Sequence, residues 1–182
     1  MQYVLASASP RRRELLAEII KDFIICPAAG EERADKSLPP EQYALALAKA
    51  KCAEVADKFP QDTVVACDTI VVYGGKILGK PKDKADARAT LAALSGKAHC
   101  VITGVCVRRG AKVACGYDRT VVRFNALTEK FICDYVESGS PMDKAGSYGI
   151  QDGGVVAGYD GSYTNVVGLP VELTEKLIKE VL

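Results

Sequence analysis

Short apolar runs alternate with amphipathic helical stretches along the whole of this 182-residue chain, and this order constrains the fold more than any other feature. The spacing of the apolar residues predicts strands at 2–6, 23–26, 63–73, 76–78, 100–108, 112–116, 120–124, 154–157 and 163–167. It predicts helices that start at Ser9-Pro10, run over 41–58, 83–94 and 128–137, and start again at Pro170. Such alternation is typical of an α/β protein with a mixed sheet and flanking helices. With no internal repeat and no linker, we expect one domain over residues 1–182.

The overall charge excludes several classes of partner. Lys and Arg number 24 against 23 Asp and Glu, so the net charge is +1. This balance gives no general attraction to nucleic acid or to an anionic membrane. The seven cysteines form no C-x-x-C pair, and the N-terminal stretch has neither a basic leader nor a membrane-spanning length of apolar residues. We therefore expect a cytoplasmic protein that binds neither nucleic acid nor membrane.

A cluster of arginines at the start of the first helix is unusual. Ser9 is a good N-cap and Pro10 suits the first helical position, but Arg11, Arg12 and Arg13 follow directly. A helix N-terminus already carries partial positive charge, so cations there are mildly destabilising. A phosphate chain docked on the N–H groups and the guanidinium forks would explain them, whereas a solvated basic patch is the alternative. Charge alone leaves the two even, and the strand that leads into this turn favours the ligand.

Asp68 interrupts the most apolar run of the chain, residues 64–72. Burying a carboxylate is costly unless it is paired, hydrogen-bonded or bound to a metal. The alternative is a strand end at which Asp68 is exposed. We favour a functional carboxylate, because carboxylates in clefts are common catalytic groups.

Further charged residues extend this picture. Lys51 falls on the apolar face of its helix, where it either extends outward to solvent or serves the site. Lys80 follows the hairpin after the Asp68 strand, and Glu31-Glu32 form an acidic pair in a loop. Carboxylates without histidine or cysteine ligands suit Mg²⁺ or Mn²⁺, and arginine with lysine suits a polyphosphate. With one histidine and no G-x-S-x-G motif, a Ser/His/Asp hydrolase is poorly supported. The residues thus predict metal-assisted phosphoryl chemistry.

The sequence resembles the Maf family of nucleotide pyrophosphatases almost from end to end. Six motifs carry the resemblance in the family's order: residues 5–12 (LASASPRR), 68–71 (DTIV), 79–81 (GKP), 94–96 (LSG), 141–151 (PMDKAGSYGIQ) and 165–170 (NVVGLP). The resemblance implies an inosine triphosphatase-like α/β fold, also called Maf/Ham1-like, with a mixed twisted sheet and two lobes around a central cleft that holds the nucleotide. It also implies a homodimer.

The resemblance further implies roles for individual residues. It makes Asp68 the catalytic carboxylate and Glu32 the acidic loop residue near the metal, so that Glu32 and Asp68 would hold Mg²⁺ or Mn²⁺. The residues that match the phosphate-facing positions are Ser7, Arg12, Lys51 and Lys80. The three positions that separate subgroups, Arg11, Thr69 and Gln151, match the subgroup that prefers dTTP and UTP. Asp152 departs from the pattern, because the family usually has glycine there, and it puts a charge beside the predicted base-reading residue.

The implied reaction is attack of water on the α-phosphorus of a nucleoside triphosphate, which releases the monophosphate and pyrophosphate. Two alternatives stay open from the sequence. One is a pyrophosphatase acting on 7-methyl-GTP or on a broad range of nucleotides. The other is a nucleotide-binding regulator of septum formation without significant catalysis.

Overall fold

A computed structural model describes residues 2–30 and 34–182 of the chain. It contains a mixed seven-stranded sheet in the order β2-β1-β3-β5-β6-β7, with β4 paired to β3 beside this path. The strands are β1 (Tyr3–Leu5), β2 (Phe23–Ile25), β3 (Thr63–Tyr73), β4 (Lys76–Leu78), β5 (Ala98–Arg109), β6 (Lys112–Phe124) and β7 (Val156–Asp160). The helices are α1 (Pro10–Ile19), α2 (Pro40–Ala56), α3 (Lys84–Leu94), α4 (Glu129–Glu137), the 3₁₀ turns η1 (Ser140–Asp143) and η2 (Ala145–Ser147), α5 (Tyr163–Val167) and α6 (Val171–Val181). The predicted mixed α/β fold is confirmed.

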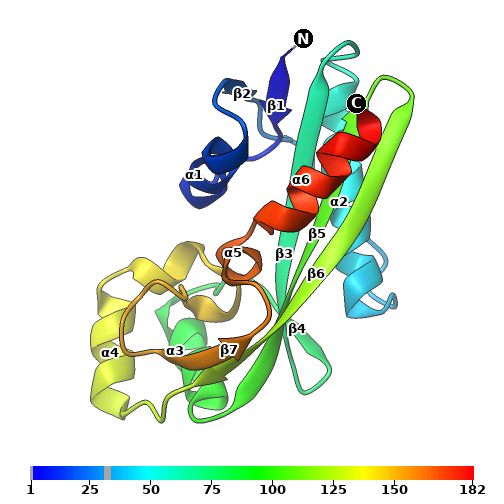
Figure 1. The fold of residues 1–182 in the computed structure, drawn as a ribbon. Coiled ribbons are helices and arrows are strands. Elements are labelled where there is room, and N and C mark those ends of the chain that lie inside the picture. The colour runs from blue at the N-terminus through cyan, green and yellow to red at the C-terminus, as the bar shows by residue number, and fades with distance from the viewer. Residues whose placement is uncertain (1, 31–33) are drawn as a thin grey trace.

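Three long antiparallel strands, β3, β5 and β6, run through the whole molecule and join its two lobes (Figure 1). The terminal lobe consists of β1, β2, α1 and α6 around one end of these strands. The distal lobe consists of β4, β7, α3, α4, η1 and η2 around the other end. Both chain termini lie in the terminal lobe (Figure 1).

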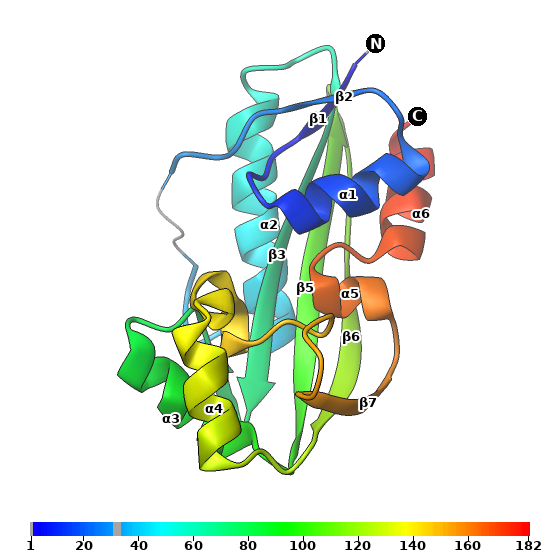
Figure 2. The same ribbon diagram turned by 90° about the vertical axis from the view of Figure 1, so that its left-hand side faces the viewer.

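The two faces of β3 are covered by different helices, because side chains of a strand alternate between faces. In the terminal lobe, Val64 and Ala66 pack with the buried face of α2. Val65 and Cys67 face the other way and pack with α1 and α6. Figure 2 shows α2 on one side of the sheet and α6 on the other. Because helices cover both faces of β3, nearly every residue of the strand is apolar. The same alternation of side chains places Asp68 on the face covered by α2 and Thr69 on the opposite face.

One edge of β3 is paired in two separate pieces. β1 pairs with Thr63 to Val65, and β4 pairs with residues 71–73 further along. Within the described part of the chain, no strand pairs with β3 on this side between those two pieces. On its other side, β3 is paired with β5 from Thr63 to Val72. The middle of β3, which carries Asp68 and Thr69, therefore borders a break in the sheet edge between the two lobes.

Gly104 allows α2 to lie close to the sheet at this level. Gly104 stands opposite Asp68 in the β3–β5 register. A Cβ atom on Gly104 would lie only 2.6 Å from the backbone carbon and oxygen of Ala44 in α2. The absence of a side chain thus lets the helix backbone approach β5, and this approach brings the later part of α2 beside β3.

Three sequence predictions about elements differ from the structure. Residues 163–167 form the helix α5, because the Ser162 side chain caps it by accepting a hydrogen bond from the Asn165 backbone. The strand expected at 154–157 begins and ends later, as β7. The strands expected at 112–116 and 120–124 are one continuous strand, β6. Across residues 2–30 and 34–182, none of the helices combines the length and the apolar character needed to cross a membrane.

Candidate active site

A cleft of about 730 Å³ opens at the break in the edge of β3. Its walls come from the β1–α1 turn, α2, the middle of β3, the segment after β4 and the 141–151 segment. Eight of the residues predicted from the sequence line it: Ser7, Arg11, Arg12, Lys51, Asp68, Thr69, Lys80 and Gln151. Residues far apart in the sequence thus meet in one cavity. The ninth, Glu32, lies outside the described residues.

Asp68 is buried on the α2 side of this cleft, with 6% of its surface exposed. The Lys51 ammonium donates a hydrogen bond of 2.6 Å to its Oδ1 atom. Lys51 lies on the buried stripe of α2, between Leu47 and Val55, as the spacing predicts. Its side chain is 18% exposed, so the ammonium compensates a charge that is largely removed from water. Lys51 thus lines the cleft and does not extend outward to solvent, and its role in the site stays a prediction.

Arg12 lies on the opposite side of β3, where three contacts fix its guanidinium. Its Nε donates to the carbonyl of Gly168 at 2.8 Å, and one terminal nitrogen donates to Thr69 Oγ1 at 3.1 Å. The other terminal nitrogen contacts Ser7 Oγ at 3.4 Å. Ser9 caps α1 by accepting a hydrogen bond from the Arg12 backbone, and the first turn of α1 has no acidic residue. The first residues of α1 line the cleft, so the positive end of the helix lies at this cavity.

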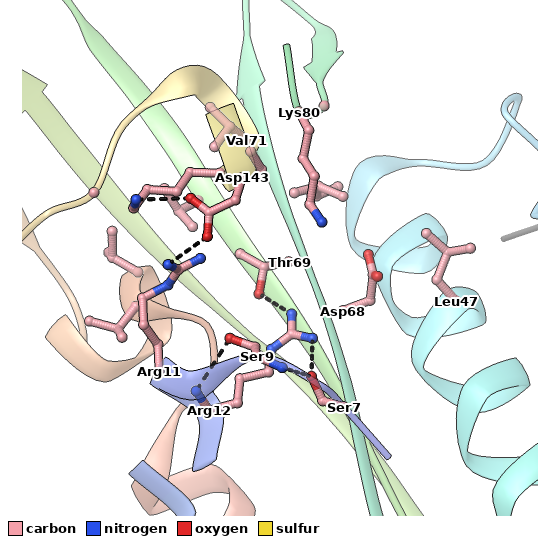
Figure 3. A pocket seen from close by; sticks show the side chains of 18 of the residues that line it. Ser7, Ser9, Arg11, Arg12, Leu47, Asp68, Thr69, Val71, Lys80 and Asp143 are labelled. Atoms are coloured by element: carbon pink, nitrogen blue, oxygen red, sulfur yellow. Dashed lines mark hydrogen bonds and ion pairs between the residues drawn. The ribbon is translucent and has the colours of Figure 1, made fainter. Parts of the chain in front are cut away.

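Side chains from both lobes face one space in this cleft (Figure 3). The Lys80 side chain reaches into it from the segment after β4, while the Asp68 carboxylate and the Arg12 guanidinium approach from the other sides (Figure 3). A carboxylate and three cationic groups (those of Arg12, Lys51 and Lys80) around one cavity can bind a chain of phosphates and accept a proton beside it.

An ion pair connects the lobes at the mouth of the cleft. Arg11 of α1 donates to Asp143 Oδ2 at 3.1 Å, and Lys144 donates to Asp143 Oδ1 at 3.0 Å. Burial alone raises the pKa of Asp143, but the hydrogen bonds from Lys144 and Arg11 outweigh burial and hold this pKa below its usual value. Arg11 thus has a partner in the distal lobe. Asp143 and Lys144 belong to the 141–151 motif, yet no pattern in the sequence marked them as site residues.

Tyr148 lines the distal wall and rests on an aromatic cluster. Its hydroxyl is 2.8 Å from Nε2 of His99, and both rings meet Phe124 edge-on. His99 is 3% exposed, and burial lowers its pKa from 6.5 to about 4. The only histidine of the chain is therefore a neutral core residue that supports this wall.

The donor set fits a hard divalent cation. Asp68 brings a carboxylate to the cleft, and Mg²⁺ is commonly held by one or two carboxylates together with phosphate oxygens and water. Across residues 2–30 and 34–182, no group of three or more His, Cys, Asp or Glu side chains could hold a metal without such help. Among the described residues, Asp68 is a carboxylate that could hold such a metal together with oxygens of the ligand.

The fold is similar to that of a HAM1 protein of known structure. The structure of a HAM1 protein from Coxiella burnetii superimposes with a TM-score of 0.57, at 14% identity and over 99% of both chains. At this identity the likeness shows the fold alone, and it confirms the expected Ham1-like architecture.

The chain belongs to the Maf family. The family model described as "Maf-like protein" matches residues 2–181. A dTTP/UTP pyrophosphatase of Pyrococcus furiosus is 47% identical over 97% of this chain and 93% of its own length. A second dTTP/UTP pyrophosphatase, from Moorella thermoacetica, is 48% identical over 96% of this chain and 92% of its own length. The resemblance inferred from the six motifs is confirmed.

Proposed function

We propose that this protein is a nucleoside triphosphate pyrophosphatase that hydrolyses dTTP and UTP to the monophosphate and pyrophosphate. The names of its relatives support the reaction and the two substrates. The observation that carries the proposal is the cleft itself, in which the buried Asp68 carboxylate and the cations of Arg12, Lys51 and Lys80 line one cavity. Its volume of about 730 Å³ is within the usual range for a pocket that encloses a ligand of nucleotide size.

The triphosphate binds along the wall formed by the β1–α1 turn and α2. The first residues of α1 and Ser7 line this wall on one side, and Lys51 and Lys80 line the cleft on the other. Arg12 is already held by Gly168 and Thr69, so little side-chain entropy is lost when its remaining surface meets a phosphate. These cations stabilise the negative charge that grows on the leaving pyrophosphate.

Asp68 accepts the proton of the attacking water. The water oxygen forms a bond to the α-phosphorus while the bond from this phosphorus to the α,β-bridging oxygen breaks, and the bond electrons leave with the pyrophosphate. Lys51 fixes Asp68 through Oδ1, which keeps the carboxylate in one orientation for this transfer. Mg²⁺ or Mn²⁺, held by Asp68 and by Glu32 of the loop, would supply Lewis-acid neutralisation of the phosphate charge.

The base lies toward the distal lobe, where Gln151 reads it. A glutamine amide can both donate to and accept from a pyrimidine edge. Arg11 and Thr69 complete the specificity set. Arg11 lies at the mouth of the cleft, where its ion pair with Asp143 limits the orientations of its side chain. Thr69 lies at the centre of the cleft, where its hydroxyl is hydrogen-bonded to Arg12 and Thr103.

A substrate panel tests the proposal. Purified protein with Mn²⁺ or Mg²⁺ is given dTTP, UTP, CTP, ATP, GTP and 7-methyl-GTP, and the products are separated by ion exchange. We expect dTMP or UMP with equimolar pyrophosphate, and the highest kcat/KM for dTTP and UTP. Orthophosphate without pyrophosphate, or a preference for 7-methyl-GTP, would contradict the proposal. Tight nucleotide binding without turnover would favour the regulatory alternative.

We further propose a cytoplasmic homodimer. All seven cysteines are free thiols, which suits a reducing compartment. Exposed apolar side chains on and beside β6 and β7, namely Val113, Tyr117, Tyr159 and Tyr163, offer surface for a second subunit. Sedimentation analysis distinguishes the 19.4 kDa monomer from a dimer.

A further inference from the structure

The segment that carries Gln151 is a tight turn. The backbone N–H of Asp152 donates to the carbonyl of Gly149 at 3.0 Å and so closes a four-residue turn from 149 to 152. Gln151 is the third residue of this turn, and it is exposed at the wall of the cleft. The conformation of the turn therefore decides where its amide points.

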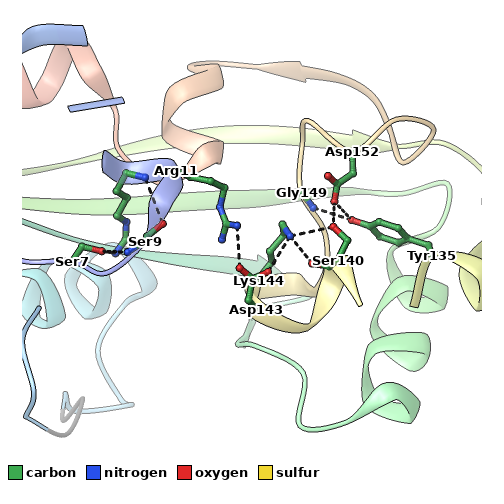
Figure 4. A network of polar contacts seen from close by, with 10 residues as sticks. Ser7, Ser9, Arg11, Tyr135, Ser140, Asp143, Lys144, Gly149 and Asp152 are labelled. Atoms are coloured by element: carbon green, nitrogen blue, oxygen red, sulfur yellow. Dashed lines mark hydrogen bonds and ion pairs between the residues drawn. The ribbon is translucent and has the colours of Figure 1, made fainter. Parts of the chain in front are cut away.

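A single hydroxyl group holds both ends of this turn. Tyr135, on α4, accepts a hydrogen bond from the backbone N–H of Gly149 at 3.1 Å. The same hydroxyl donates to Asp152 Oδ2 at 2.5 Å, and Ser140 Oγ donates to this oxygen at 2.8 Å. Figure 4 shows the Asp152 carboxylate turned toward Tyr135 and Ser140. The first and last residues of the turn are thus tied to one rigid aromatic side chain.

The inside of the turn has no spare room. A Cβ atom on Gly149 would lie 2.9 Å from Asp152 Oδ2 and 3.1 Å from Cδ of Gln151. The Asp152 carboxylate and the Gln151 side chain therefore both pass close over Gly149. We expect a change in the position of the carboxylate to alter the space available to the Gln151 side chain.

The phenol remains a donor under neutral conditions. Burial, followed by the hydrogen bond to Asp152, raises the pKa of Tyr135 well above its ordinary value of 10.0. Two hydroxyl groups, those of Tyr135 and Ser140, thus donate hydrogen bonds to the Asp152 carboxylate. These hydrogen bonds offset the charge that Asp152 places beside the predicted base-reading residue.

We propose that Tyr135 and Asp152 form a positioning unit that holds the Gln151 amide toward the nucleobase and thereby sets the preference for uracil and thymine. This inference rests on the proposed function and names the residues that set its specificity. Neither residue contacts the reacting atoms. Their removal should change recognition of the base and leave the phosphate chemistry intact.

The primary test is Tyr135→Phe, which keeps the ring and removes the hydroxyl group. The substitution removes both hydrogen bonds of this hydroxyl, and a net effect on Gln151 equal to one hydrogen bond, about 0.5–1.5 kcal/mol, corresponds to a change of about two- to twelvefold. We expect KM for UTP to rise by this factor, with kcat within about twofold of the unchanged protein. The ratio of kcat/KM for UTP to that for CTP should fall by a similar factor. Asp152→Ala should behave in the same way, whereas Asp152→Asn keeps an acceptor for Tyr135 and should retain most of the selectivity.

A double-mutant cycle separates positioning from a general structural effect. In a Gln151→Ala background, Tyr135→Phe should produce no further loss of selectivity, because the side chain that it positions is gone. Tyr159→Phe and Asp160→Asn, at exposed positions of β7 outside this network, are the matched controls and should leave the selectivity ratio unchanged. An equal loss in both backgrounds, or unchanged selectivity in Tyr135→Phe and Asp152→Ala, would overturn the inference.

Calorimetric binding of α,β-methylene-UTP and α,β-methylene-CTP provides a readout that does not need turnover. If the unchanged protein binds these analogues without hydrolysing UTP, the proposed function fails, and the cycle is then read from the dissociation constants. If hydrolysis occurs but the cycle shows no coupling, the function stands and the positioning role of Tyr135 and Asp152 is rejected.

Discussion

The two ends of the cleft are built in different ways. At the terminal-lobe end, the site residues lie on regular elements: Asp68 and Thr69 on β3, Lys51 on α2 and Arg12 on α1. At the distal end, Gln151 sits in a tight turn, and its support comes from side-chain hydrogen bonds between short segments. Regular elements hold reacting groups within narrow tolerances, whereas a turn can be altered without disturbing the sheet. The comparison suggests that reaction and recognition can change separately in this fold.

The charges at the two ends also differ in exposure. The Lys51–Asp68 pair is mostly buried, with side chains 18% and 9% exposed. The Asp143 side chain of the Arg11–Asp143 pair is 61% exposed. An exposed pair contributes about 0–1 kcal/mol, whereas removal of one partner from a buried pair costs about 3–5 kcal/mol. Substitutions at the two ends should therefore have effects of very different size.

Asp68→Asn should have the largest effect. The amide cannot accept the proton of the attacking water, so kcat should fall by about 10²–10⁴-fold, the range typical of a general base. Because Lys51 loses a buried anionic partner, the melting temperature should also fall. Steady-state kinetics and circular dichroism measure both effects. Asp143→Asn is the matched substitution at the exposed end and should lower kcat by less than about tenfold; equal losses in the two variants would break the comparison.

Acid should weaken the distal end through His99. Its folded-state pKa is about 4, below its ordinary 6.5, so between these values the unfolded chain binds a proton at His99 that the folded chain does not. Stability is therefore lost as the pH falls from 6.5 toward 4, by about 3 kcal/mol in total.

The substitution His99→Gln, which removes this titration, isolates the effect. Urea unfolding of both proteins at pH 7 and pH 4 gives the difference directly. We expect the unchanged protein to lose about 3 kcal/mol more than the variant over this interval. An equal loss in both proteins would show that His99 is not the group responsible.

Gly104→Ala tests the close approach of α2 to the sheet at the terminal-lobe end of the cleft. The new Cβ atom would meet the Ala44 backbone at 2.6 Å, so α2 must move away from β5, at a cost of about 1–3 kcal/mol. Since α2 carries Lys51, the fit of the Lys51–Asp68 pair should loosen and kcat/KM should fall as well.

Gly116→Ala in the neighbouring strand β6 is the control. Its Cβ atom would meet a side-chain methyl group of Leu173 at 3.2 Å, and this flexible group can shift. We expect a smaller change in the urea midpoint and unchanged kinetics. A Gly104→Ala protein that is as stable and active as Gly116→Ala would refute the importance of this close approach.

The terminal-lobe end was largely predictable from sequence because its signals are local. An apolar strand interrupted by Asp68, a capped helix that starts with arginines, and Lys51 on an apolar stripe are each visible within a few turns of chain. The break in the sheet edge that exposes Asp68 to the cleft is not visible in this way, since it depends on where β1 and β4 pair with β3. The role of Glu32 stays a prediction, because this residue lies outside the described part of the chain.

The distal end was predictable only through the family resemblance. The aromatic and β-branched residues Tyr163, Thr164, Val166 and Val167 favour a strand. The Ser162 cap and the buried Asn165 amide, which donates hydrogen bonds to Val101 and Thr120, stabilise a short helix instead. The contacts of Tyr135 with Gly149 and Asp152 span 14 and 17 residues. No periodic pattern in the sequence predicts contacts between such segments. Neither the hydrogen bonds of the Tyr135 hydroxyl nor the orientation of the Asp152 carboxylate toward it could therefore be inferred from the sequence.

Hydrolysis of UTP in water enriched in ¹⁸O locates the reacting phosphorus, which is the centre of the proposed mechanism. Water that is activated beside Asp68 and attacks the α-phosphorus places the label in UMP and leaves the pyrophosphate unlabelled. Mass spectrometry of the two products after a single turnover reads this directly. Label in the pyrophosphate would mean attack at the β-phosphorus and would contradict the arrangement of carboxylate and cations proposed for this cleft.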